Sequence, residues 1–125
     1  MIIPKLERNR ITDLLSFQLK NSPNENAFSD KVTGSWRKFS TSKVTEIVDK
    51  LSLAMLKLGI QKGDNIALIS RNRVEWNFVD LSVMQIGAVV VPLYPNNSED
   101  NYTFIFDDAN VRLVFVEDKE ILRKV

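Results

Sequence analysis

The chain of 125 residues contains no cysteine and no histidine, and it has only four glycines. Without cysteine it has no disulfide framework, no thiolate nucleophile and no thiolate ligand for a metal. Without histidine it lacks the commonest general base of enzymes and the commonest zinc ligand. The glycines lie too far apart for a phosphate-binding loop or a dinucleotide fingerprint. These absences exclude several familiar kinds of catalytic site.

Strong charge and long apolar runs are also missing. The formal net charge is +1, so no strong overall field favours nucleic acid or an anionic membrane. The longest apolar run, residues 86–93, contains a proline and is far too short to span a bilayer. Residues 1–8 are interrupted by charge and proline and do not resemble a signal peptide. The hydrophobic fraction of 44% is that of an ordinary globular protein.

The first forty residues predict a helix followed by a hairpin. Thr12 is a candidate cap for a helix over residues 13–20. Residues 26–39 read as a short β-hairpin in which Gly34 supplies the turn. Its apolar members are expected to be buried; they are Ala27, Phe28, Trp36 and Phe39.

A long amphipathic helix is expected next. Ser40, Thr41 or Ser42 begins it, and apolar residues recur at three- and four-residue spacing as far as Leu58. Gly59 follows the last apolar position, where a left-handed C-cap is needed, and Ile60 is expected to make the accompanying hydrophobic contact.

The central stretch, residues 63–95, predicts a strand, a helix and a second strand. Residues 66–69 are a short apolar run after a Gly-Asp turn. Asn72 is expected to cap the helix, with Glu75 completing a capping box, and Gly87 ends it. The β-branched run 89–91 shows no polar alternation, as in a strand covered on both faces. Such a unit is a parallel βαβ motif with a right-handed crossover.

The remaining residues extend this pattern. Ser98 is expected to cap a helix that ends at Asn110. Residues 113–116 are expected to form a third strand. A last helical segment follows, with apolar residues at positions 121, 122 and 125. The fold class is therefore α/β: an open, mainly parallel sheet with flanking helices. Residues 1–125 are expected to form a single partial domain, with the hairpin at 26–39 and the parallel α/β core at 40–125. Sequential strands are expected to be neighbours.

Ligands of open parallel sheets bind outside the carboxyl ends of the strands. Arg71 and Arg73 follow the first core strand and are candidates to hold a phosphate or carboxylate, although a solvated loop is the simpler interpretation. Tyr94 follows the second strand, and core packing is expected of it rather than a place in a pocket. Trp76 is expected to anchor the core.

The other chemically capable side chains do not predict a site. Carboxylates occur at positions 107, 108, 117, 118 and 120, but neighbouring helical residues diverge, so helix-surface charge is the expected role. The serines at 70, 82 and 98 have no histidine to activate them. We therefore expect no catalytic, cofactor-binding or metal-binding residue in this chain.

Two segments carry a family resemblance. They read Gly63-Asp64-x-Ile-Ala-x-Ile-Ser-x-Asn-Arg-x-Glu-Trp76 and Gly87-Ala-x-x-Val-Pro-Leu-Tyr-Pro95. Together they resemble the amino-terminal part of AMP-forming acyl-CoA synthetases, and most of all the long-chain fatty acid–CoA ligases. The resemblance runs from about residue 13 to residue 125. Residues 96 and 97, both asparagine, depart from the family pattern.

The resemblance implies a ligase that converts ATP, a fatty acid and CoA into acyl-CoA, AMP and pyrophosphate through an acyl-adenylate, with Mg²⁺. The phosphate loop and the other catalytic motifs of that family match no part of this sequence, so we expect an inactive amino-terminal portion of such an enzyme. The alternatives are a non-catalytic α/β binding module, or a ligase for shorter or aryl carboxylic acids.

The expected partners follow from the same resemblance. They are the rest of a parent ligase chain and its fatty acid substrate, with no nucleic acid. An exposed sheet edge also predicts self-association. The parent is expected to be cytoplasmic or peripherally bound to a membrane.

Overall fold

A computed structural model describes residues 10–125 of the chain. It contains five helices and five strands in that range: α1 (Asp13–Asn21), β1 (Phe28–Val32), β2 (Ser35–Phe39), α2 (Thr41–Lys57), β3 (Asn65–Ile69), α3 (Val74–Gln85), β4 (Val89–Leu93), α4 (Glu99–Asp108), β5 (Val111–Val116) and α5 (Lys119–Leu122). The α/β class, the hairpin and the parallel βαβ unit are confirmed.

The core sheet has three parallel strands in the order β4-β3-β5. Since β3 pairs with both of the others, the expectation that sequential strands are neighbours is wrong for β4 and β5. The four apolar residues of β3 are buried, as its central position requires. β4 lies at an edge instead, and Val89 is 49% exposed, so the prediction of a strand covered on both faces fails there.

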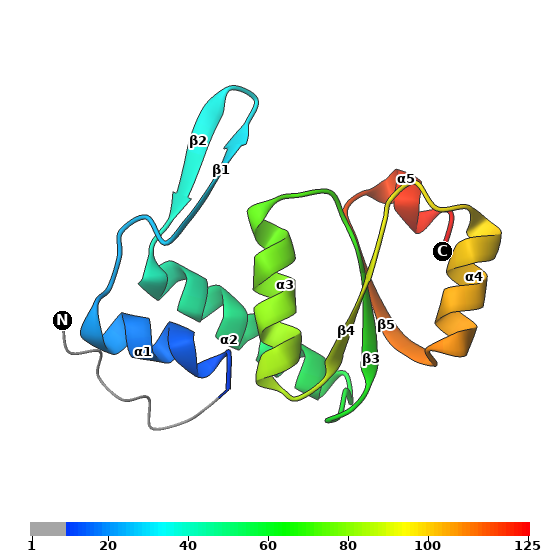
Figure 1. Cartoon of the computed structure of the whole chain (residues 1–125), viewed down its shortest axis with the longest axis horizontal. Helices are drawn as coiled ribbons and strands as arrows, with labels where there is room; N and C mark the ends of the chain where they lie inside the picture. Colours follow the sequence, from blue (N-terminus) through cyan, green and yellow to red (C-terminus); the bar gives the residue numbers. More distant parts are fainter. Residues whose placement is uncertain (1–9) are drawn as a thin grey trace.

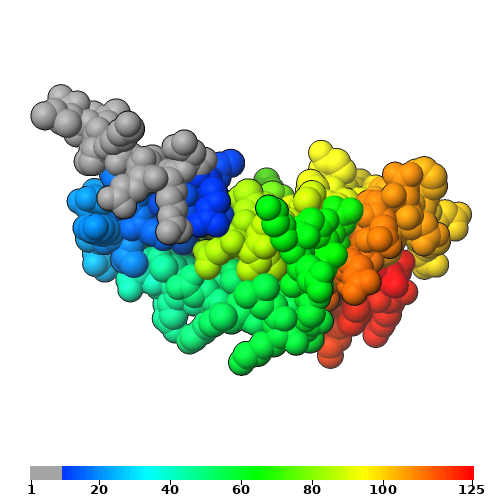
Figure 2. All heavy atoms as spheres, turned by 90° about the horizontal axis from the view of Figure 1, so that it is seen from below, coloured from blue at the N-terminus to red at the C-terminus, as the bar shows by residue number. Residues whose placement is uncertain are grey.

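Helices cover both faces of this sheet (Figure 1). On one face, Met55 of α2 and Val83 of α3 pack against Ile66 and Leu68. On the other, Tyr102 of α4 and Ile121 of α5 pack against Ile69. In Figure 2 the same arrangement gives an elongated body, with α4 and α5 at the end opposite the blue α1.

A separate apolar cluster joins α1, α2, α3 and the hairpin. Leu15, Val44, Val48 and Phe78 are buried in it. Phe28 and Phe39 of the hairpin meet the Phe78 ring edge-on, with centroids 6.3 and 5.1 Å away. Trp36 was expected in this core, but it is 64% exposed because it lies on the opposite face of the hairpin.

The ends of α2 follow the sequence prediction. The Ser40 hydroxyl accepts a hydrogen bond from the Lys43 amide at 3.2 Å and so caps the first turn. At the other end Gly59 has φ +85°, and the amide of the buried Ile60 donates to the Met55 carbonyl at 3.1 Å. This is the left-handed cap that was predicted. Leu58, by contrast, is exposed.

The start of α3 differs from the prediction. Its N-cap is Arg73, not Asn72, and the cap residue's own side chain makes no capping hydrogen bond. The Val74 amide donates instead to the carboxylate of Asp30, 44 residues earlier on the hairpin, at 3.2 Å. A tertiary contact therefore replaces the local cap that the sequence suggested.

Candidate functional site

The loops that follow β3 and β5 meet at the carboxyl edge of the sheet. Glu117, directly after β5, accepts a hydrogen bond from the Arg71 amide at 2.6 Å and lies 3.5 Å from the Ser70 hydroxyl. Its other carboxylate oxygen is 3.7 Å from Nε of Arg71. The Glu117 side chain is only 16% exposed, so these contacts fix it in place. It joins the ends of two neighbouring strands.

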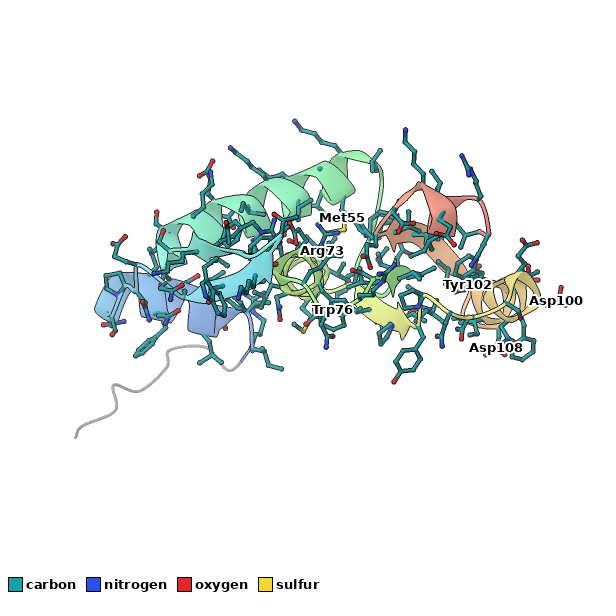
Figure 3. All side chains as sticks on the ribbon, turned by 90° about the horizontal axis from the view of Figure 1, so that it is seen from above. Met55, Arg73, Trp76, Asp100, Tyr102 and Asp108 are labelled. Atoms are coloured by element: carbon teal, nitrogen blue, oxygen red, sulfur yellow. The ribbon has the colours of Figure 1, made fainter. Side chains whose placement is uncertain are left out.

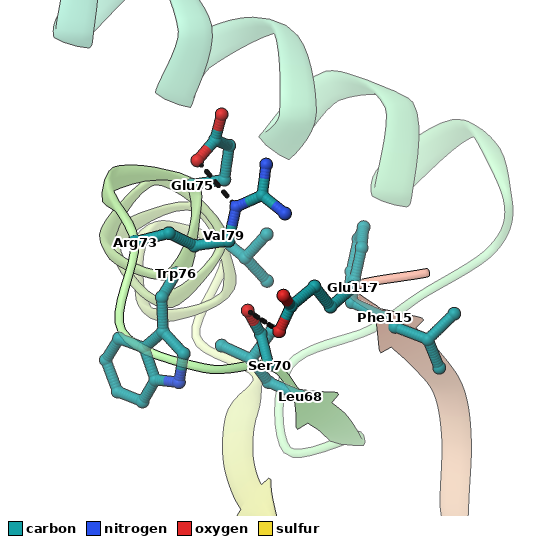
Figure 4. A pocket seen from close by; sticks show the side chains of 9 residues that line it. Leu68, Ser70, Arg73, Glu75, Trp76, Val79, Phe115 and Glu117 are labelled. Carbon is teal, nitrogen blue, oxygen red and sulfur yellow. Dashed lines mark hydrogen bonds and ion pairs between the residues drawn. The ribbon is translucent and has the colours of Figure 1, made fainter. Parts of the chain in front are cut away.

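A pocket of about 230 Å³ lies beside this junction (Figure 4). Its apolar walls come from β3, α3 and β5, and its rim is polar. The lining residues are Leu68, Ser70, Arg73, Glu75, Trp76, Val79, Phe115, Val116 and Glu117. The chain leaves β3 through α3 on one face and leaves β5 through α5 on the other. Such a divergence is where open α/β sheets commonly form a crevice.

An ionic cluster lies at one side of the pocket and links the hairpin to α3. Arg37 donates to Asp30 across the hairpin and to both oxygens of Glu75, at 2.7 and 3.1 Å. Glu75 also accepts from Nε of Arg73 at 2.8 Å. We call these four side chains the clasp. Every one of them has an oppositely charged partner within it.

The clasp shifts the pKa of its members. The hydrogen bond from Arg37 lowers the pKa of Glu75 to about 2, against the opposing effect of burial. The same guanidinium lowers the pKa of Asp30, and the Val74 amide adds to that effect. The pKa of Arg73 is raised by its hydrogen bond to Glu75. All four groups are therefore charged at neutral pH, and their roles are structural rather than acid–base.

The structure separates the two arginines that the sequence grouped as an anion site. The Arg71 side chain is largely exposed and pairs with Glu117, whereas the Arg73 side chain turns to Glu75. Tyr94 is 77% exposed, which contradicts the expectation that it packs in the core. Trp76 packs beside the core as expected, but it is only half-buried and also lines the pocket.

The remaining candidates serve secondary structure. The Ser98 hydroxyl caps α4, and the Asp118 carboxylate caps α5. The buried Ser82 hydroxyl lies 3.2 Å from the Val48 carbonyl, across the contact between α2 and α3. In Figure 3, Asp100 and Asp108 lie on the outer side of α4 while Tyr102 turns inward. Within residues 10–125 no three acidic side chains converge on a point that would hold a metal ion.

Sequence reasoning missed Asp30 and Arg37. Their positions on either side of a two-residue turn make them a cross-strand pair, and that signal was available. The link to Glu75, 38 residues further on, had no local signal.

Across the described part of the chain, no helix is both long and apolar enough to cross a bilayer.

Comparisons with known proteins give a consistent result. The model of the family described as AMP-binding enzyme matches residues 15–125. A long-chain fatty acid–CoA ligase of Mycobacterium bovis is 22% identical over 89% of this chain and 18% of its own length. A 4-coumarate–CoA ligase-like protein of Arabidopsis thaliana is 30% identical over 88% of this chain and 19% of its own.

Solved structures share the fold. A fatty acid AMP ligase from Legionella pneumophila superposes with a TM-score of 0.83 at 16% identity, over 94% of this chain and 21% of that one. At this identity the likeness concerns the fold alone. The chain spans about one fifth of the length of the ligases it matches.

Proposed function

This chain belongs to the AMP-binding enzyme family, and on that premise we propose that it forms the amino-terminal part of a long-chain fatty acid–CoA ligase. The parent enzyme would use ATP to convert a fatty acid into an acyl-adenylate and then transfer the acyl group to CoA. The observation that carries the proposal is the family match over residues 15–125, together with relatives named as long-chain ligases.

The residues of the pocket do not fit a nucleoside triphosphate. A triphosphate requires several free cations or backbone amides, and here Arg73 is paired with Glu75 while Glu117 adds a second negative group at the rim. We therefore derive no catalytic step from this chain. ATP, CoA and Mg²⁺ would be held by other parts of the parent, and residues 1–125 would act as one partial domain that supports them.

Calorimetry on the 125-residue chain tests whether the substrates are held by other parts of the parent enzyme. Titration with ATP and with oleate should give no saturable heat, because the residues that would hold them are not in this chain. Saturable ATP binding by the chain alone would contradict the proposal and favour a binding module. The enzyme activity itself is tested by oleate-dependent exchange of pyrophosphate into ATP, measured on the product of the complete gene.

An aryl or shorter-chain acid ligase is the second candidate. It is favoured by the relative named 4-coumarate–CoA ligase-like, which is the more identical of the two at 30%. The same exchange assay with 4-coumarate in place of oleate decides between them. Exchange that depends on 4-coumarate alone would replace the long-chain assignment.

Self-association is part of the proposal as well. β4 and β5 each have one side without a strand partner in the described sheet. Pro92 removes a hydrogen-bond donor from β4, so β5 offers the better edge for a second copy. Light scattering should show a mass that rises with protein concentration, and a constant monomer mass would refute this idea.

A further inference from the structure

The hairpin β1–β2 has two faces with different chemistry. Directly opposed residues of antiparallel strands share a face, and the register pairs Lys31 with Trp36 and Ser29 with Lys38. One face therefore carries Ser29, Lys31, Trp36 and Lys38. We call this set the outer face. The opposite face carries Phe28, Asp30, Arg37 and Phe39, which contact α3.

The outer face combines an exposed indole with unpaired positive charge. Trp36 is exposed, and so are Lys31 and Lys38. Neither lysine has an ion-pair partner among the described residues. The outer face carries two basic residues, Lys31 and Lys38, and no acidic one, whereas Arg37 lies on the opposite face and is paired with Asp30 and Glu75. The outer face is therefore positively charged although the net charge of the whole chain is only +1.

The clasp holds this face in position. Arg37 and Asp30 bind the start of α3, and the two hairpin phenylalanines pack on Phe78, so the inner face is committed to the body of the protein. Figure 1 shows the turn of the hairpin projecting away from the rest of the chain. The indole and the two lysines are consequently presented outward on a supported strand pair.

We propose that the outer face of the hairpin docks onto an anionic lipid surface, with Trp36 at the level of the headgroups and the two lysines over lipid phosphates. Tryptophan favours the membrane–water interface because its ring is apolar and its N–H is polar. Lysine is attracted to the negative surface potential of anionic lipids.

The size of the patch favours a membrane over a protein partner. A stable protein interface uses about 20–30 residues on each side. The projecting hairpin offers the eight residues 31–38 at most, which is fewer than such an interface uses. A membrane surface needs no complementary shape. Docking of the outer face requires no ligase activity.

Vesicle binding by the 125-residue chain tests the proposal. Trp36 and Trp76 are the only tryptophans, so a Trp76→Phe variant leaves Trp36 as the sole tryptophan, which can be excited selectively over the two tyrosines. Vesicles of equal parts phosphatidylglycerol and phosphatidylcholine should shift its emission to the blue and carry the protein into the pellet. Phosphatidylcholine vesicles should do neither.

Matched variants separate this surface from general charge attraction. The double variant Lys31→Glu, Lys38→Glu should lower the partition coefficient about 25-fold or more, since each lysine near an anionic surface contributes about fivefold. The control Lys57→Glu, Lys62→Glu makes the same charge change at exposed lysines. Lys57 ends the 17-residue helix α2, which begins beside the hairpin, so it lies about 25 Å along the helix from the hairpin, and Lys62 follows it. This separation exceeds the Debye length, so the control should stay within about twofold. Circular dichroism verifies that each variant is folded.

Three results would overturn the proposal. Equal losses in the two double variants would mean that only net charge matters. An unshifted Trp36 emission on anionic vesicles would mean that the indole does not reach the lipid. A shift on soluble polyglutamate but not on vesicles would assign the outer face to an acidic protein partner instead.

Discussion

Replacing Glu75 by glutamine removes the carboxylate that joins the hairpin to α3. Taken at face value, a pKa lowered from 4.5 to about 2 corresponds to about 3 kcal/mol of coupling. The Glu75 side chain is 39% exposed, so solvent screens the pair and we expect about 1 kcal/mol at neutral pH. Arg37 keeps its contact with Asp30, which prevents a larger loss.

The effect should depend on pH with a definite sign. Because the pKa of Glu75 is lower in the folded than in the unfolded chain, its stabilisation is complete above pH about 4.5 and disappears as the pH falls toward 2. The difference between the wild type and Glu75→Gln should therefore shrink by more than half between pH 7 and pH 3. Urea unfolding followed by circular dichroism measures it at each pH.

Glu25→Gln is the matched control. Glu25 is exposed and has no ion pair among the described residues, so its substitution should leave the urea midpoint unchanged. If Glu75→Gln costs as much at pH 3 as at pH 7, the loss comes from side-chain packing and not from charge. If it costs nothing at pH 7, the clasp contributes no net stability.

Three further changes probe other parts of the fold by the same urea assay. Ser82→Ala removes a buried hydroxyl that bonds carbonyls of α2 and α3 and should cost about 1–2 kcal/mol, whereas exposed Ser42→Ala should cost less than about 0.5 kcal/mol. Gly59→Ala should cost about 1 kcal/mol, because φ +85° disfavours a side chain; an unchanged midpoint would contradict the left-handed cap. Tyr102→Phe removes a 2.8 Å hydrogen bond to the Tyr94 carbonyl and should cost about 1 kcal/mol near pH 7. Burial raises the pKa of Tyr102 in the folded chain, so the unfolded chain loses this proton first as the pH rises. The free energy of unfolding of the wild type should therefore fall above pH about 10, and Tyr102→Phe should lose this dependence. Urea unfolding measures the free energy, and a spectrophotometric titration follows the ionisation of the tyrosine.

Local signals predicted most of the fold. The cap at Ser40, the left-handed turn at Gly59 and the hairpin turn before Ser35 each depend on residues within a few positions of one another, and each is found. The apolar run 66–69 identified the buried strand for the same reason. Periodicity and turn residues report on local conformation, so they succeed where conformation is decided locally.

Long-range choices were not predictable in this way. Asn72 had the chemistry of a cap, but the carboxylate of Asp30 occupies that role from a distant strand. Trp36 is apolar, yet its position in the hairpin register places it opposite Lys31 on the solvent side. Val89 has the composition of a central strand and lies on an edge, because β3 pairs with both neighbours. The pocket is likewise formed by segments up to 49 residues apart, from Leu68 to Glu117. No single segment therefore carries a sequence signal that predicts it.

The middle place of β3 has a consequence for how the protein is made. This strand leaves the ribosome before both of its partners, and β5 ends 47 residues after it, at Val116 compared with Ile69. At about 5–20 residues per second the most deeply buried strand waits several seconds for its second neighbour. During that interval only α2 and then α3 can cover β3, and they cover one face of it. Slow translation through α4 would prolong the exposure of the other side, so synonymous codon changes there should alter the soluble yield without altering the protein.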